Sequence, residues 1–161
     1  MEGVEEKYGE PYSKLLRYAE LLRTKNPNTL IKIQLHERSI QSKEYLIFKR
    51  IFIYFKAMKK DYLEGCRPFL GLDGCHLKGP YDGILLFAVS IDGNEGLFSM
   101  AYGVVEIECK NRWRFFFQYL YLCIGGVTVD NTLIIIFDKQ KVCTFSYYML
   151  KFLLIFVALM H

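Results

Sequence analysis

Between residues 67 and 138 the chain carries a fixed series of apolar segments, and their order limits the folds open to it. Residues 67–73 and 133–137 are short apolar strands, and each leads directly into an aspartate at its end, Asp73 and Asp138. Between them lie two further strand patterns joined by an Asp-Gly-Asn turn, then aromatic residues at helical spacing over 109–123. The predicted order is strand, strand, strand, helix, strand.

The two aspartates are the candidate site residues. A helical crossover usually makes strands parallel and places them in one sheet. If the strands of Asp73 and Asp138 are parallel neighbours, both carboxylates emerge at the same carboxyl edge of that sheet. Ligand sites of open α/β sheets lie at that edge. Two neighbouring carboxylates repel each other, and a shared Mg²⁺ or Mn²⁺ stabilises their ionised forms. The alternative is that both aspartates only cap turns at strand ends, and spacing alone leaves it open.

The first 64 residues form a separate region upstream of this series. Helical periodicity predicts a helix over residues 5–25, and Pro27 ends it. Strict alternation predicts a strand over 29–35. The aromatic and β-branched run at 45–55 suits either a strand or a helix, and we predict a helix.

Composition is less decisive. The 161 residues carry a formal charge of +4, which permits an acidic partner without requiring one. Basic residues alternate with acids, as in "ERSIQSKEYLIFKR", and this pattern predicts solvated helix faces rather than a binding patch. The five cysteines form no CxxC pair, so we expect Cys66 and Cys75 to be small buried hydrophobic residues rather than metal ligands with His76. Free thiols suit the cytosol or the nucleus.

Longer motifs carry a resemblance. The chain reads GLDG-CH-LKG, then a DGN turn, then VVE-x-E-x-K-x-x-W, and "FDKQK" follows the last strand. In this order the motifs resemble the central domain of plant Mutator-like transposases, from about residue 6 to Lys141. The resemblance implies an α/β fold with a ribonuclease H-like mixed sheet over 65–141, incomplete at its C-terminal end and preceded by the small helical and strand region 1–64.

The same resemblance implies functional roles. Asp73 is similar to the first acid of a catalytic triad and Asp138 to the second, with Mg²⁺ or Mn²⁺ as the cofactor, DNA as the partner and the nucleus as the location. Glu106 and Glu108 match family acids at the strand-to-helix junction and are possible accessory residues. The family's third acid, a glutamate, has no counterpart after Lys141, and Phe137 replaces a serine. We therefore expect a truncated catalytic domain that is inactive alone. The alternative is a non-catalytic module that binds DNA or protein.

The tail, residues 142–161, departs from the family pattern. Residues 143–160 are almost wholly apolar, with Lys151 as their one charge. Three explanations stay open: a frame or splice accident, a buried element completing the cover of the sheet, or a membrane span, which Lys151 disfavours. An exposed apolar tail would also promote self-association.

Overall fold

The computed structural model describes residues 10–40, 43–78, 83–107, 110–124 and 134–137. Three helices and six strands lie within these ranges. Their order is α2 (Glu10–Lys25), β1 (Leu30–Ile40), β2 (Lys43–Tyr54), α3 (Lys56–Gly65), β3 (Phe69–His76), β4 (Ile84–Ile91), β5 (Leu97–Val105), α4 (Lys110–Ile124) and β6 (Ile134–Phe137).

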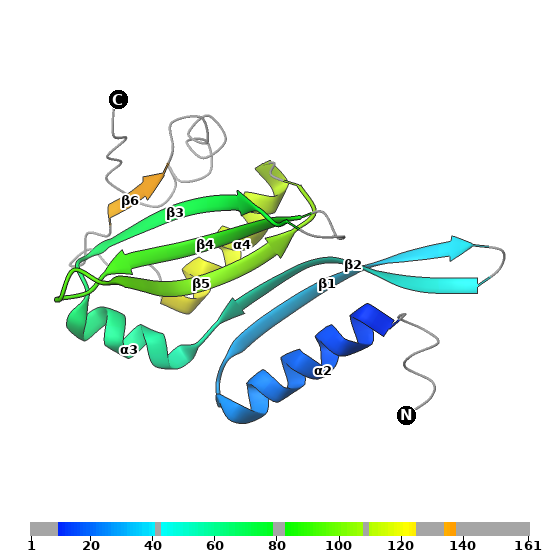
Figure 1. Cartoon of the computed structure of the whole chain (residues 1–161), viewed down its shortest axis with the longest axis horizontal. Helices are drawn as coiled ribbons and strands as arrows, with labels where there is room; N and C mark the ends of the chain where they lie inside the picture. Colours follow the sequence, from blue (N-terminus) through cyan, green and yellow to red (C-terminus); the bar gives the residue numbers. More distant parts are fainter. Residues whose placement is uncertain (1–9, 41–42, 79–82, 108–109, 125–133, 138–161) are drawn as a thin grey trace.

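All six strands belong to one mixed sheet, ordered β1-β2-β5-β4-β3-β6 (Figure 1). Neighbouring strands are antiparallel except β3 and β6, which are parallel. Helix α4 connects β5 to β6, and two antiparallel pairings give β3 the same direction as β5, so this crossover leaves β6 parallel to β3. The order β3, β4, β5, α4, β6 confirms the predicted series, and the α/β arrangement is compatible with a ribonuclease H-like mixed sheet.

The main core lies between the sheet and α4. Helical spacing turns Trp113, Phe116 and Leu120 toward the sheet, and Phe116 is fully buried. Its ring meets that of Phe52 on β2 edge to face, with 5.4 Å between centroids. Gly103 on β5 lies beneath Phe116, so helix and strand approach closely there. The aromatic run of α4 is therefore what fixes this helix on the sheet.

A smaller core lies on the opposite face, under α2. Ala19 of the helix is buried against Ile31 of β1 and Ile51 of β2. The next residue on β2, Phe52, belongs instead to the core under α4. Since successive strand residues point to opposite faces, α2 and α4 cover opposite sides of the sheet.

The prediction of a helix over residues 45–55 is wrong, because residues 43–54 form strand β2. β2 runs between β1 and β5 and is covered on both faces near its end, by α2 and by α4. A strand buried on both sides needs apolar residues at consecutive positions, so the alternation that identifies a strand is lost.

Three of the other predicted elements are confirmed, and one helix of the structure was not predicted. The strand at 29–35 is confirmed as the start of β1, and the helix expected over 5–25 is confirmed from Glu10 onward. The turn between β4 and β5 is confirmed: Asp92 Oδ1 accepts hydrogen bonds from the backbone N–H groups of Asn94 and Gly96. Helix α3 was not predicted.

The tail predictions lie outside the described residues, since residues 138–161 are not among them. In the described ranges, no helix has both the length and the hydropathy needed to cross a membrane.

Candidate active site

Asp73 lies within strand β3, on the face of the sheet opposite α4. Leu70 and Leu72 are buried in the core under α4, and alternation places Asp73 on the other side, where it is exposed. The strand was predicted to finish on Asp73 but extends three residues further, to His76. The carboxylate therefore projects from a strand paired with β4, and the turn alternative does not apply to it.

The backbone beside Asp73 orients its carboxylate. Asp73 Oδ1 accepts a hydrogen bond from the N–H of Gly74, with 2.7 Å between the two atoms. Gly74 itself has a packing role, because a Cβ there would lie 2.9 Å from Cδ2 of Leu86 and 3.3 Å from Cγ2 of Ile84. The absence of a side chain at Gly74 therefore serves the packing on the core side of the strand.

The parallel pairing of β3 with β6 brings together the two strands that carry the candidate acids. Phe69 pairs with Ile134, and the register continues to Leu72 beside Phe137. Asp73 and Asp138 are the next residues in sequence on the two strands. Asp138 lies outside the described residues, so the structure tests the pairing of the strands and not the position of the second carboxylate.

Glu106 lies away from Asp73. The ladders place Asp73 beside Phe87 and Phe87 beside Tyr102, and Glu106 is four residues beyond Tyr102 on the chain. Two strand spacings and four residue rises put Glu106 on the order of 15 Å from Asp73, too far to share one ion with it. Its Oε2 lies 2.9 Å from Nε of Arg112, a half-buried ion pair without hydrogen-bond alignment. Glu108 lies outside the described residues.

The described side chains provide only some of the ligands that a divalent cation needs. A carboxylate such as that of Asp73 is the hard oxygen ligand that Mg²⁺ and Mn²⁺ prefer. Within the described ranges, however, no three His, Cys, Asp or Glu side chains gather as a metal-binding group. Cys75 and His76 are both exposed and point to opposite faces of β3, so they do not form the alternative site with Cys66. Cys75 is therefore not the buried residue that we expected, whereas Cys66 is half-buried at the edge of the core.

Arg50 is the residue that the sequence interpretation placed wrongly. It belongs to the stretch expected to form solvated helix faces, yet it lies on a strand with 6% of its surface exposed. A guanidinium enclosed to this degree is uncommon without compensating contacts. The only sequence signal was its place in a run of apolar residues.

Comparison with known proteins identifies one family. Residues 69–147 match the family model described as the MULE transposase domain, a segment that includes β3 to β6, Asp73 and Asp138 and ends six residues beyond Lys141. No curated protein and no solved structure matches the chain.

Proposed function

Because residues 69–147 are a Mutator-like transposase domain, we propose that this chain provides the DNA-cleaving core of a DNA transposase, with Asp73 and Asp138 as its metal-holding acids. One observation supports the assignment above the others: the strands that lead to the two aspartates are parallel neighbours, in register up to Leu72 and Phe137. The carboxyl edge of parallel strands is the usual place for a ligand in such a sheet.

Asp73 and Asp138 would hold Mg²⁺ or Mn²⁺ through carboxylate oxygens. A bound cation of this kind supplies Lewis acidity toward a phosphodiester and lowers the pKa of a bound water. The contribution of the chain is to present the Asp73 carboxylate on an exposed strand face, which leaves room for a DNA backbone to approach. The hydrogen bond from Gly74 N–H limits the directions in which that carboxylate points.

We further propose that this stretch of sequence binds the cation weakly and does not perform strand transfer on its own. Two carboxylates leave most of the coordination sphere of Mg²⁺ or Mn²⁺ to water. Glu106, the expected accessory acid that lies within the described residues, is paired with Arg112 at a distance from Asp73. The accessory role expected for Glu106 is therefore not part of the proposal.

Calorimetric titration with Mn²⁺ tests the metal site. The parent chain should bind, and the Asp73→Asn/Asp138→Asn variant should not. Asp61→Asn, which removes one exposed carboxylate from α3, is the matched control and should bind like the parent. Equal Mn²⁺ binding by the parent and the double variant would reject the two aspartates as the site.

A plasmid-nicking assay with Mn²⁺ tests the second part of the proposal. We expect no strand transfer and little nicking from the parent chain. Nicking that Asp73→Asn abolishes would show that two acids suffice, and the proposed inactivity would then be wrong although the site assignment would stand.

The alternative function is a non-catalytic module that binds DNA or protein. It would show DNA binding that neither divalent cations nor Asp73→Asn change.

We propose a nuclear location because DNA is the expected partner, and imaging of a fluorescent fusion tests it. Recovery of the fusion in a membrane fraction would instead favour a role for residues 143–160 as an anchor, and size-exclusion chromatography tests self-association.

A further inference from the structure

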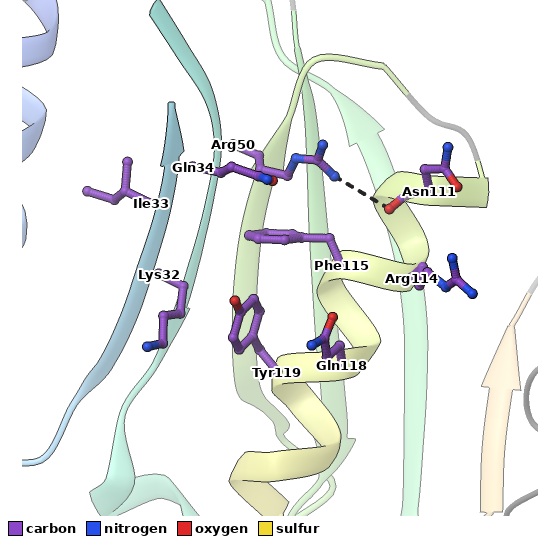
Figure 2. A pocket seen from close by; sticks show the side chains of 9 residues that line it. All are labelled: Lys32, Ile33, Gln34, Arg50, Asn111, Arg114, Phe115, Gln118 and Tyr119. Atoms are coloured by element: carbon purple, nitrogen blue, oxygen red, sulfur yellow. Dashed lines mark hydrogen bonds between the residues drawn. The ribbon is translucent and has the colours of Figure 1, made fainter. Parts of the chain in front are cut away.

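A pocket of about 320 Å³ opens between the β1–β2 hairpin and the flank of α4 (Figure 2). It lies on the α4 side of the sheet, whereas Asp73 lies on the other. The residues that line it come from the two strands of this hairpin and from α4, which is distant from them in sequence: Lys32, Ile33, Gln34, Arg50, Asn111, Arg114, Phe115, Gln118 and Tyr119.

Strand and helix periodicity build the pocket. On β1, Ile31 and Ile33 pack toward α2, so alternation turns Lys32 and Gln34 to the α4 side. On α4, one side of the helix next to its core-facing residues borders the pocket. The lining residues on that side recur at helical spacing, at positions 111, 114–115 and 118–119. Because β1 lies at the edge of the sheet beyond β2, this flank and the exposed side of β1 enclose a recess.

The lining is positively charged. Lys32, Arg50 and Arg114 contribute three cations, and none of the nine lining residues is acidic. In Figure 2 Lys32 and Arg50 lie beside the two aromatic rings, while the Arg114 guanidinium points outward from the helix. The other polar lining groups are amides and the Tyr119 hydroxyl, which can donate hydrogen bonds. This combination favours an anion with several acceptor oxygens.

The two inner cations are held in place. The Arg50 guanidinium lies over the Phe115 ring at 5.1 Å, and its Nη1 donates to the Asn111 carbonyl oxygen at 3.5 Å. The Lys32 ammonium lies over the Tyr119 ring at 5.9 Å. Cation–π contacts restrict these side chains before any ligand arrives, so less conformational entropy is lost on binding.

We infer that this pocket binds a backbone phosphate of a nucleic-acid strand, with the adjoining nucleotide against the aromatic side of α4. Its volume is at the small end for ligand sites, which suits one nucleotide rather than the width of a duplex. Arginine, lysine and aromatic rings in one groove are the usual components of single-strand binding. The choice of nucleic acid over other phosphate compounds rests on the proposed function.

The pocket is separate from the candidate metal site. Arg50 is three residues from Ile53, which shares a row of the sheet with Tyr102, Phe87 and Asp73. Three strand spacings and three residue rises put Arg50 on the order of 15–20 Å from Asp73. A strand bound here would be held apart from the reacting phosphodiester, as a second point of contact on the same molecule.

The test is fluorescence anisotropy with a labelled single strand of about twelve nucleotides, a length within the range of single-strand binding sites. Lys32→Gln should weaken binding about tenfold at low salt, the size expected for one charge-assisted phosphate contact. It should also reduce the slope of log K against log salt by about 0.7. Lys60→Gln is the matched control, because it removes one exposed lysine from α3, outside the pocket, and it should bind like the parent.

Gln118→Glu provides a second variant that keeps every cation and places a carboxylate in the pocket. It should also weaken binding, and circular dichroism melts should show both pocket variants folded. Free thymidine monophosphate and inorganic phosphate serve as competitors. Displacement of the oligonucleotide only at millimolar concentrations of either would support a strand, whereas direct tight binding of free phosphate would overturn the choice of nucleic acid.

The outcomes separate this inference from the proposed function. If Lys32→Gln and Gln118→Glu bind the strand as tightly as Lys60→Gln, the pocket assignment is wrong, and Asp73-dependent Mn²⁺ binding is unaffected by that result. If instead the double aspartate variant loses no Mn²⁺ affinity while strand binding still depends on Lys32, the metal site fails and the pocket stands.

Discussion

Replacing Gly103 by alanine tests the packing of α4 on the sheet. A Cβ at this position would lie 2.8 Å from Cδ2 of Phe116 and 3.3 Å from the carbonyl oxygen of Ile51. Phe116 is fully buried, with its ring against those of Phe52 and Trp113, so it cannot move aside without disturbing them. Overpacking of this kind costs about 1–3 kcal/mol.

The change also has a favourable part. Alanine restricts the unfolded chain relative to glycine, which contributes about 0.4–1 kcal/mol where the folded backbone accepts it. The expected net loss for Gly103→Ala is therefore about 1–2 kcal/mol in the free energy of unfolding. Gly71→Ala on β3 is the matched control, because its Cβ would meet Cγ2 of Val89 at an ordinary 3.4 Å. That variant should be neutral or slightly more stable than the parent.

Urea titration followed by circular dichroism measures the free energy of unfolding of both variants, and thermal melts measure their Tm. For a chain of this size the predicted difference of about 2 kcal/mol between them corresponds to about 4–8 °C in Tm. Adding Phe116→Leu to Gly103→Ala should cost less than the sum of the single changes, because the smaller side chain relieves the contact. Equal midpoints for Gly103→Ala and Gly71→Ala would refute the close approach of α4 to β5.

Two further predictions concern ionisable groups. Burial, opposed by Lys59, raises the pKa of the Cys123 thiol from 9.0 to about 11, so stability should fall as pH rises from about 9 toward 11. Between pH 9 and 11 the Cys123 thiol loses its proton in the unfolded chain but keeps it in the folded chain. Cys123→Ala should therefore reduce the decline in Tm measured across this pH range. Glu106→Gln should lower the free energy of unfolding by less than about 1 kcal/mol, because it removes a half-buried ion pair with Arg112, and should leave calorimetric Mn²⁺ affinity unchanged. A large loss of Mn²⁺ binding in Glu106→Gln would show that Glu106 belongs to the metal site.

The sequence was most informative where periodicity and turn chemistry agree. The hairpin of β4 and β5 was predictable because Asp92 and Gly93 follow one apolar run and precede another, and Asp92 closes the turn with its carboxylate. The aromatic spacing of α4 was equally clear, since one face of the helix had to be buried. The direction of β6 was predictable from the crossover through α4, whereas its pairing with β3 was a condition of the hypothesis that the structure then met.

The candidate acids and the phosphate pocket differ in how far the sequence reveals them. Asp73 stands in a contiguous motif, so the strand that carries it followed from a few adjacent residues, although that strand continues to His76. The pocket instead needs Lys32, Arg50 and Tyr119 from β1, β2 and α4, and no local pattern joins them. Its prediction depended on β2 being a strand. Because β2 is covered on both faces, its continuous apolar run resembled a helix, and a helix there would have placed Arg50 on a solvated surface. Only pairing of β2 with both β1 and β5 sets that arginine beside the rings of α4, so a single misassigned element was enough to conceal the whole pocket.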